Sequence, residues 1–213
     1  MKREIDLLRF PHIDRELGSR TEAHRAIARR FDREFFDGSR DTGYGGYADD
    51  GRWQAVALRI MLHYGLKPGD RVLDIGCAKG FLVRDLRTLG LDAFGIDVSE
   101  YAISKSVAQP YTLAMDVLEM ADWSLPGSGK SFNLVVSVNT LHNLERKRLA
   151  EVLSWLPRLS IRQYVTVDAW RNEEQRLRME AWNLTAKTMM SVADWKVFFD
   201  QVGYQGDYWW FMP

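Results

Sequence analysis

The chain has 213 residues, of which 46% are hydrophobic, and its 29 lysine and arginine residues balance 29 aspartate and glutamate residues to give a formal net charge of zero. This length and apolar content predict one domain with a full hydrophobic core, and the balanced charge argues against a general nucleic-acid binder, which carries a basic excess. A single cysteine precludes an internal disulfide, no apolar run reaches membrane-spanning length, and residues 1–10 are charged where a signal peptide is apolar, so we expect a cytoplasmic protein that does not enter a membrane.

The first part of the chain predicts a helix followed by a glycine-rich loop. Residues 1–13 show no firm pattern. Over residues 14–36 apolar side chains recur on one helical stripe, and Gly38 ends the pattern. In the loop of residues 40–53, the sequence G-Y-G-G-Y places Tyr44 and Tyr47 among three glycines. Exposed tyrosines are costly without a use, so we interpret this loop as a lid whose tyrosines face a ligand; an ordinary surface loop is the alternative.

The next stretch predicts a strand, a tight turn and a helix. A helix over residues 51–64 leads into residues 71–80, R-V-L-D-I-G-C-A-K-G, where the apolar run predicts a strand and Gly76 and Gly80 a turn. An amphipathic helix follows over residues 81–89, and a second strand over residues 93–96 ends at Asp97. Glycines let a ligand approach the backbone, a helix N-terminus offers free N–H groups, and a carboxylate at this distance suits a ribose hydroxyl pair. Alone, the pattern fits any nucleotide-binding unit or a structural turn.

The motif V-L-D-I-G-C-A-K-G, followed by G-I-D-V-S, resembles the class I S-adenosylmethionine-dependent methyltransferases. The likeness runs from about Trp53 to the end of the chain, and Ala78 stands where family members often carry glycine. It implies an α/β fold with a Rossmann-like, mostly parallel sheet of six or seven strands, helices on both faces, N-terminal helices and a lid loop. We therefore expect one domain over residues 1–213, with an N-terminal helix and lid segment (1–52) and a Rossmann-like core (53–213).

The resemblance implies S-adenosylmethionine as the cofactor, bound at the glycine turn. A strand over residues 111–115 leads to Asp116, which the resemblance assigns, with Val117, to the adenine; capping of a following turn is the alternative for Asp116. Trp123 is either an adenine wall or part of the core. The expected cofactor-binding residues are Asp74, Gly76, Cys77, Lys79, Gly80, Asp97, Val98, Asp116, Val117, Asn139, Tyr44 and Tyr47.

Polar residues that follow two further predicted strands are the candidates for catalysis. Asn139 and His142 follow the strand of residues 132–138, and Asp168 follows that of residues 163–167. Ligands of open α/β sheets lie outside the carboxyl ends of the strands. We assign His142 as the general base, because its ordinary pKa of about 6.5 suits proton transfer near neutrality, with helix capping as the alternative. Asp168 is the second candidate, and no metal is expected, because one histidine and one carboxylate make a poor metal site.

The last part of the chain predicts three helices and one strand. The helices cover residues 145–155, ended by Pro157, residues 173–190, and residues 192–201, and the aromatic strand covers residues 204–212. This count gives six strands, whereas the family has seven and ends in a β-hairpin, so the seventh is absent or hidden in residues 171–190. We expect Arg171 and Trp182 to contact the substrate with Tyr44, Tyr47 and His142; ion pairing in solvent is the alternative for Arg171. The last strand is an edge that could pair with another chain, so we expect a monomer or a homodimer.

The resemblance implies methyl transfer, and we expect the acceptor to be an O or N atom of a small molecule, such as a sugar, an amino-acid derivative or a natural-product intermediate. The neutral charge and the aromatic lid favour a modest acceptor. RNA or protein methylation is an alternative, which clustering of the arginines in residues 25–33 on one face would favour. A non-catalytic protein that binds S-adenosylmethionine is another. The glycine spacing departs from the dinucleotide fingerprint, which argues against a dehydrogenase.

Overall fold

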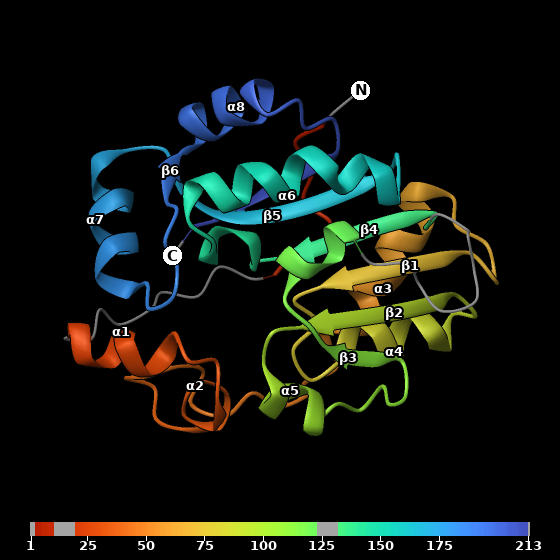
Figure 1. The fold of residues 1–213 in the computed structure, drawn as a ribbon, viewed down its shortest axis with the longest axis horizontal. Helices are drawn as coiled ribbons and strands as arrows, with labels where there is room; N and C mark the ends of the chain where they lie inside the picture. Colours follow the sequence, from red (N-terminus) through yellow and green to blue (C-terminus); the bar gives the residue numbers. More distant parts are fainter. Residues whose placement is uncertain (1–2, 11–19, 123–131, 213) are drawn as a thin grey trace.

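A computed structural model of the chain describes residues 3–10, 20–122 and 132–212, and its centre is a parallel sheet of seven strands (Figure 1). The strands lie in the order β3-β2-β1-β4-β5, and both β6 and β7 pair with β5. The strands are β1 (Arg71–Ile75), β2 (Asp92–Asp97), β3 (Thr112–Ala114), β4 (Leu134–Val138), β5 (Gln163–Trp170), β6 (Met190–Ser191) and β7 (Asp207–Phe211). The Rossmann-like sheet predicted from the sequence is confirmed.

Helices cover both faces of the sheet, as the alternation of side chains along each strand requires. Val72 of β1 packs into one apolar cluster, and its neighbour Leu73 packs into the cluster on the opposite face. The first cluster is closed by α3 (Arg52–Tyr64), α4 (Phe81–Thr88) and α5 (Glu100–Ser104), and the second by α6 (Arg146–Leu159) and α8 (Val192–Gln201). No helix in the described part of the chain is long and apolar enough to cross a membrane.

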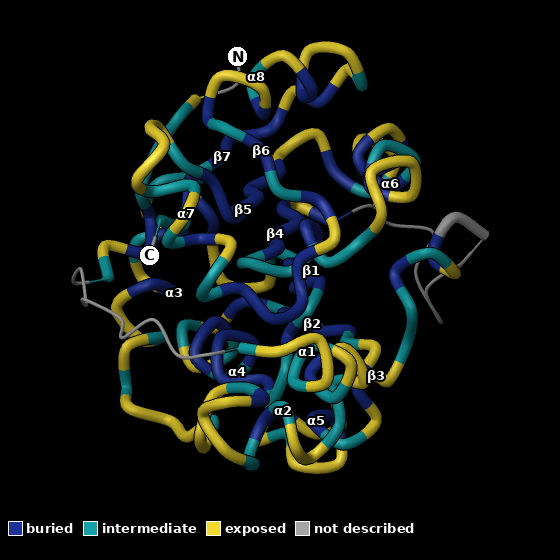
Figure 2. The backbone as a smooth tube through the Cα atoms, turned by 90° about the vertical axis from the view of Figure 1, so that its left-hand side faces the viewer, coloured by how far each residue is buried: buried dark blue, intermediate teal, exposed yellow. Residues whose placement is uncertain are grey.

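The carboxyl ends of β1, β2 and β4 point to one side of the molecule (Figure 1). The chain passes from β1 to β2 to β3 in one direction and then returns to place β4 on the other side of β1. Ligands of such sheets bind at this reversal. The helices α1 (Glu22–Ala28), α2 (Arg33–Asp37) and α7 (Glu173–Trp182) gather around the same side, which faces the viewer in Figure 2.

The single helix predicted over residues 14–36 is wrong in the described part of that stretch, and residues 14–19 lie outside the described residues. Two short helices, α1 and α2, are separated by residues 29–32. Phe31 has a left-handed φ of 52°, which does not continue a helix. Asp32 then caps α2 by accepting the N–H of Glu34 at 3.0 Å. The apolar stripe read from the sequence is therefore divided between two helices.

The sheet contains a seventh strand that the sequence count missed. The helix predicted over residues 173–190 ends at Trp182, because Asn183 has an extended backbone with ψ of 139°. Met190 and Ser191 pair with Ala169 and Trp170 as β6, so the sequence pattern of residues 171–190 had concealed a strand. β7 pairs with β5 in parallel, and the terminal hairpin of the family is not formed.

The helix predicted to end at residue 155 runs four residues further, through Pro157 to Leu159. Proline removes one helical N–H, but Leu153 and Leu156, which precede it, are fully buried and hold this part of the helix against the sheet. The N–H of Ser160 donates to the carbonyl of Leu156 at 3.2 Å, which closes the last turn. Tertiary packing therefore outweighs the local effect of the proline.

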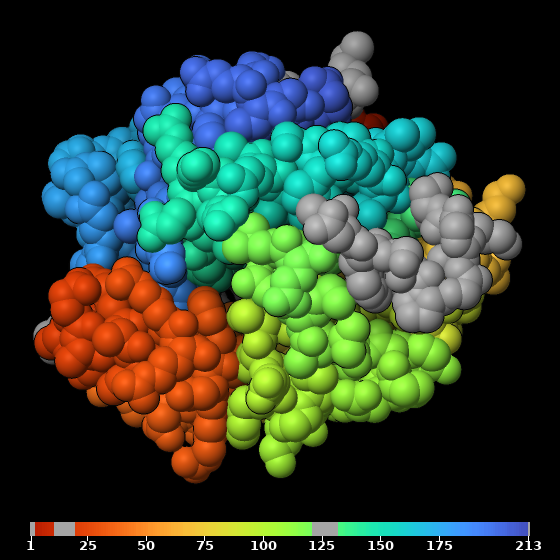
Figure 3. All heavy atoms as spheres, in the orientation of Figure 1, coloured from red at the N-terminus to blue at the C-terminus, as the bar shows by residue number. Residues whose placement is uncertain are grey.

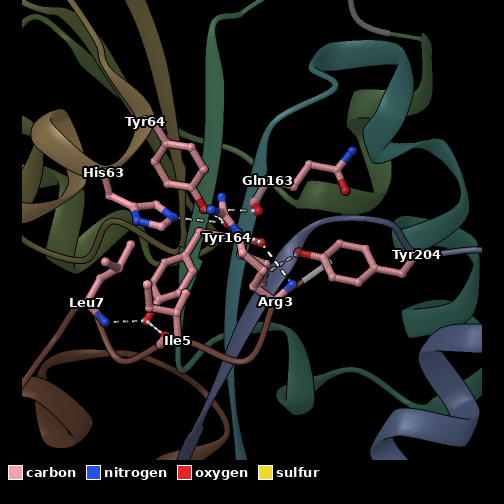
Figure 4. A network of polar contacts seen from close by, with 9 residues as sticks. Arg3, Ile5, Leu7, His63, Tyr64, Gln163, Tyr164 and Tyr204 are labelled. Atoms are coloured by element: carbon pink, nitrogen blue, oxygen red, sulfur yellow. Dashed lines mark hydrogen bonds and ion pairs between the residues drawn. The ribbon is translucent and has the colours of Figure 1, made fainter. Parts of the chain in front are cut away.

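The N-terminal residues cover the edge of β7 that the sequence left open to another chain. The N–H of Ile5 donates to the carbonyl of Tyr208 at 3.0 Å, and the N–H of Tyr208 donates to the carbonyl of Arg3 at 2.9 Å. Beside this contact, the Tyr164 hydroxyl accepts the N–H of Leu7 and donates to the carbonyl of Ile5, both at 3.2 Å (Figure 4). This edge of the sheet is therefore paired within the chain.

A polar cluster fastens the same segment from the amino end of the sheet. Arg3, His63 and Tyr64 converge in Figure 4, and each binds the carboxylate of the buried Asp207, at 3.0, 3.2 and 3.0 Å. Burial alone would raise the pKa of Asp207, but these three donors outweigh it and lower the pKa. The ionised carboxylate thus ties α3, β7 and the N-terminus together.

Candidate active site

The turn after β1 leaves no room for side chains at its two glycines. Gly76 and Gly80 have left-handed φ values of 84° and 74°. A Cβ on Gly76 would lie 2.0 Å from the Oγ1 of Thr140, and one on Gly80 would lie 2.5 Å from the Oγ of Ser106. Ala78, where the family often has glycine, also has a positive φ, of 49°. Glycine is therefore required at positions 76 and 80, because Thr140 and Ser106 pack directly against the turn at the carboxyl end of β1.

The thiol of Cys77 packs beneath this turn. Its side chain is buried, and a Cβ on Gly95 of β2 would lie 2.6 Å from the Cβ of Cys77. Burial raises the pKa of the thiol well above its ordinary value, so it is a neutral packing group. The N–H of Cys77 donates to the carbonyl of Ile96 at 3.0 Å. Cys77 fixes the turn against β2.

Asp97, at the end of β2, braces the turn from its other side. One carboxylate oxygen accepts the N–H of Ala78 at 2.8 Å, and the other accepts the N–H of Ser99 at 2.8 Å. Burial is the largest influence and raises its pKa, while these two hydrogen bonds oppose the rise. Each oxygen retains a second lone pair, which suits a pair of ligand hydroxyls. The next residue, Val98, is 54% exposed on the same edge.

Asp74 is a buried carboxyl group without a partner inside the described part of the chain. Its side chain lies in β1 and is 4% exposed, and no hydrogen bond or ion pair reaches its carboxyl oxygens there. Burial, followed by the charge of Asp97, raises the pKa of Asp74 to about 8. A cationic group placed beside it would favour its ionised form. The site therefore combines a backbone cradle, a hydroxyl acceptor and a carboxyl group suited to positive charge.

The raised pKa of Asp74 predicts that replacing it with asparagine stabilises the ligand-free protein at high pH. The unfolded carboxyl ionises near pH 4 and the folded one near pH 8, so the folded state retains a proton that the unfolded state loses. Stability therefore falls as pH rises from about 4 to about 8. Chemical denaturation should show Asp74→Asn and wild type equal near pH 4 and the variant more stable by at least about 1 kcal/mol at pH 8. A constant difference across this range would contradict the assignment.

The loop of residues 38–50 carries its two tyrosines over this cradle. The rings of Tyr44 and Tyr47 lie 4.6 Å apart, and Tyr47 stacks on Phe81, the first residue of α4, at 5.3 Å. Burial, followed by the charges of Asp97 and Asp168, raises the pKa of Tyr44 to about 12. The side chain of Tyr44 nevertheless remains 41% exposed, so protein surrounds it on most sides while solvent still reaches it. Both tyrosines lie where the sequence predicts a lid.

Lys79 points from the glycine turn toward this loop. Its ammonium group binds both carboxylate oxygens of Asp37 at 2.7 Å and the carbonyl of Tyr47 at 2.9 Å. These three contacts use its three N–H donors. The side chain predicted to contact a cofactor is therefore engaged with α2 and the loop.

Asp168 receives two donors whose directions are fixed by the backbone. The N–H of Asp168 donates to Nδ1 of His142 at 3.2 Å, so Nε2 carries the proton and faces the Asp168 carboxylate at 3.3 Å. Asn183 accepts the N–H groups of Thr185 and Ala186 through its side-chain oxygen, so its NH2 group points to Asp168. Burial lowers the pKa of His142, although the charge of Asp168 opposes this, so His142 is neutral near pH 7. Both of its ring nitrogens are engaged.

Asn139 follows the end of β4 and contacts Thr166 of β5, the strand that also carries Asp168. Its φ is 51°, and its N–H donates to the carbonyl of Thr166 at 3.1 Å. The Thr166 hydroxyl donates to the Asn139 side-chain oxygen at 2.7 Å. This contact holds the asparagine amide in one orientation at the carboxyl edge.

Asp116 caps a turn, as the alternative interpretation requires. Its carboxylate accepts the N–H of Leu118 at 2.9 Å and starts the 3-10 helix η1 (Val117–Asp122), in which Val117 is buried. The carboxylate is half-buried at the end of β3, on the same edge of the sheet as Asp97. Trp123 lies outside the described residues.

Arg171 and Trp182 lie further from the cradle. Arg171 binds Glu4 at 3.0 Å, and both side chains are partly exposed, which matches the ion-pair alternative. Trp182 contacts Phe211 with ring centroids 5.1 Å apart, and the guanidinium of Arg20 lies 5.5 Å from its ring. Within the residues that the structure describes, no cluster of three histidine, cysteine or acidic side chains could hold a metal.

Two residues of this site, Asn183 and Asp37, were not predicted. Asn183 lay within an expected helix, and Asp37 lay near the end of another. A sequence signal existed only for Asp37, which is an acidic residue just before Gly38 and the tyrosine loop. The contacts of both span long separations along the chain, so spacing alone could not reveal them.

Comparison with known proteins places this geometry in context. Residues 72–160 match the family described as a methyltransferase domain. The ubiquinone biosynthesis O-methyltransferase of Sinorhizobium medicae (strain WSM419) is 28% identical in an alignment of 95 residues that covers 40% of this chain and 38% of that protein. The aligned part is thus less than half of that relative.

Solved structures share the fold at low sequence identity. A SAM-dependent methyltransferase from Archaeoglobus fulgidus superposes with a TM-score of 0.56 and 22% identity, covering 81% of this chain and 72% of that one. Phosphoethanolamine N-methyltransferase 2 of Haemonchus contortus, in complex with S-adenosyl-L-methionine, gives a TM-score of 0.57 at 16% identity, covering 83% of this chain and 44% of that one.

Proposed function

Because residues 72–160 form a class I S-adenosylmethionine-dependent methyltransferase domain, we propose that this chain transfers a methyl group to an O or N atom of a small-molecule acceptor. The observation that carries the proposal is the cradle at the carboxyl end of β1. There the glycine turn and the brace from Asp97 meet the buried carboxyl of Asp74, which has no partner among the residues that the structure describes.

The residues of the cradle fit the cofactor of this class. We assign Asp97 to the ribose hydroxyls and the backbone from Gly76 to Gly80 to the amino-acid portion. Asp74 suits the positive charge of the cofactor, because a cation beside this buried carboxyl group would lower its raised pKa and favour the ionised form. Asp116 and Val117 are assigned to the adenine, with Val98 beside them. Asn139 and the two lid tyrosines complete the enclosure.

When bound, the cofactor supplies an electrophilic methyl group, so the protein has to align the acceptor and receive a proton. The geometry favours Asp168 over His142 as the proton acceptor. His142 has no ring nitrogen left for a substrate while it holds Asp168, whereas Asp168 offers carboxyl oxygens that are kept in place by His142 and Asn183. In addition to burial, the charges of Asp97 and Asp168 both raise the pKa of Tyr44, so this tyrosine lies near the proposed ribose contact and near the proposed proton acceptor.

Several features support a small acceptor. The chain has no net charge, and Arg25 binds the carbonyl groups of Glu180 and Asn183 instead of joining an arginine face on α1. This counts against the RNA alternative. One similar protein is named an O-methyltransferase and another a phosphoethanolamine N-methyltransferase. The proposal therefore includes both oxygen and nitrogen as the methylated atom.

The acceptor class can be tested with S-adenosylmethionine that carries a labelled methyl group. The protein is incubated separately with a small-molecule extract, total RNA and total protein. The proposal predicts label in the small-molecule fraction. Label only in RNA or protein would contradict it, and cofactor binding without transfer to any fraction would favour the non-catalytic alternative.

Replacing the proton acceptor should slow transfer without weakening cofactor binding. We expect Asp168→Asn to lower turnover of the acceptor found above by at least about 100-fold, because general-base catalysis contributes factors of this size. The affinity for S-adenosylhomocysteine should change by less than about twofold, since Asp168 lies on the acceptor side. Glu174→Gln, an exposed carboxylate on α7, is the control. Equal turnover in Asp168→Asn and wild type would remove Asp168 from the reaction.

A further inference from the structure

The lid segment is a single hydrogen-bonded unit. The carbonyl of Phe35 accepts the N–H of Tyr44 at 2.9 Å, and the carbonyl of Phe36 accepts the N–H groups of Gly46 and Tyr47 at 3.3 and 2.8 Å. The side chain of Phe36 is 2% exposed, and its ring stacks on Tyr44 at 6.0 Å. These hydrogen bonds join helix α2 and the loop into one unit, which covers residues 33–47. Figure 3 shows the N-terminal segment as one block against the residues around α5, and α2 packs on α5.

One ion pair joins this unit to the glycine turn. The carboxylate of Asp37, the last residue of α2, binds the ammonium of Lys79 through both oxygens at 2.7 Å. The two side chains are 28% and 13% exposed. The Tyr101 hydroxyl donates to the same carboxylate at 2.8 Å. Burial opposes ionisation of Asp37, but these donors outweigh it and lower its pKa, so the pair is charged near neutral pH.

Asp37 and Lys79 also form hydrogen bonds with the backbone N–H and carbonyl of Tyr47. The N–H of Tyr47 donates to Asp37 at 3.2 Å, and the carbonyl of Tyr47 accepts from Lys79 at 2.9 Å. The ring of Tyr47 stacks on Phe81, the residue that follows Gly80 of the glycine turn, with ring centroids 5.3 Å apart. The ion pair thus determines where the aromatic cover lies.

We propose that Asp37 and Lys79 are positioning residues that latch the segment of residues 33–47 over the cofactor cradle and control the release of the demethylated cofactor. The inference rests on the proposed function and deepens it, because it assigns Lys79 to the lid instead of to the cofactor itself. A ligand held beneath Tyr47 leaves only when the latch opens, so the dissociation rate depends on the strength of the ion pair.

The test measures dissociation of S-adenosylhomocysteine from the full chain by stopped-flow displacement. We expect Asp37→Asn and Lys79→Met each to raise the dissociation rate about tenfold, as loss of a partly buried charge-assisted contact predicts. Tyr101→Phe, which removes one hydrogen bond and no charge, should give a smaller increase. Glu34→Gln is the matched control, because it removes an exposed ion pair with Arg33 on the same helix and should leave the rate unchanged.

A double-mutant cycle separates latching from general damage. If Asp37 and Lys79 act as one latch, the double variant Asp37→Asn with Lys79→Met should release S-adenosylhomocysteine no more than about twofold faster than either single variant. Thermal unfolding of every variant confirms that the core is intact. Unchanged dissociation rates in Asp37→Asn and Lys79→Met, or a double variant in which the two single effects multiply, would overturn the latch while leaving the proposed function standing. Failure of the wild type to bind S-adenosylhomocysteine would overturn both.

Discussion

Replacing Asp97 with alanine is expected to weaken binding of S-adenosylhomocysteine by about 100-fold. A hydrogen bond to a charged group contributes roughly 1.5–3 kcal/mol, and the ribose offers two hydroxyls to this carboxylate, so the loss corresponds to about 3 kcal/mol. The same change removes the acceptor for the N–H groups of Ala78 and Ser99, which fix the turn and the start of α5. Isothermal titration calorimetry of the purified variant measures the affinity.

Two further variants separate the ribose contact from damage to the turn. Asp97→Asn keeps the shape and one acceptor oxygen but removes the charge, and we expect a loss of about tenfold. Asp92→Ala, at the other end of β2, removes a 40% exposed carboxylate that pairs with Arg87, and its affinity should match the wild type. Equal affinity in Asp97→Ala and wild type would remove Asp97 from the cofactor site.

Placing a methyl group on Gly76 is expected to destabilise the fold by roughly 2–4 kcal/mol. The added Cβ would lie 2.0 Å from the Oγ1 of Thr140, and overpacking of this kind costs about 1–3 kcal/mol. The left-handed φ of 84° adds about 1 kcal/mol for any residue with a side chain. Urea denaturation of Gly76→Ala measures the sum.

Gly65 provides the control for the backbone contribution alone. It caps α3 with a φ of 60°, and a Cβ there would meet no atom within 4 Å. Gly65→Ala should therefore cost only about 1 kcal/mol. If both alanine variants lose the same stability, the close approach of Thr140 to the turn is not the reason for glycine at position 76.

The part of the site that the sequence predicted is the part built from neighbouring residues. The apolar run, the two glycines and Asp97 belong to one strand, turn and strand unit, and each signal arises within about 25 positions of the next. Parallel strands then bring their carboxyl ends to one edge, which places Asn139, His142 and Asp168 near that unit without any knowledge of side-chain contacts. The fold could be predicted for the same reason, because its alternating strands and helices each give a local sequence pattern.

What the sequence did not reveal depends on contacts between distant residues. Asn183 reaches Asp168 because the chain leaves α7 in an extended conformation, whereas helical periodicity predicted that α7 would continue. We propose Asp168 in place of His142 as the proton acceptor for a similar reason: the tautomer of His142 is fixed by the N–H of Asp168, which no spacing rule includes. The first predicted helix is likewise divided at Phe31, whose left-handed backbone conformation helical periodicity does not predict.

Equilibrium dialysis of the wild-type chain against labelled S-adenosylmethionine tests the central claim most directly. The cradle formed by Gly76, Gly80 and Asp97, beside an Asp74 carboxyl that no described residue contacts by a hydrogen bond or ion pair, predicts one molecule bound per chain, with a dissociation constant of about 1–100 μM, in the range typical of enzyme cofactors and substrates. No binding at about 1 mM cofactor, ten times the upper end of that range, would contradict the account.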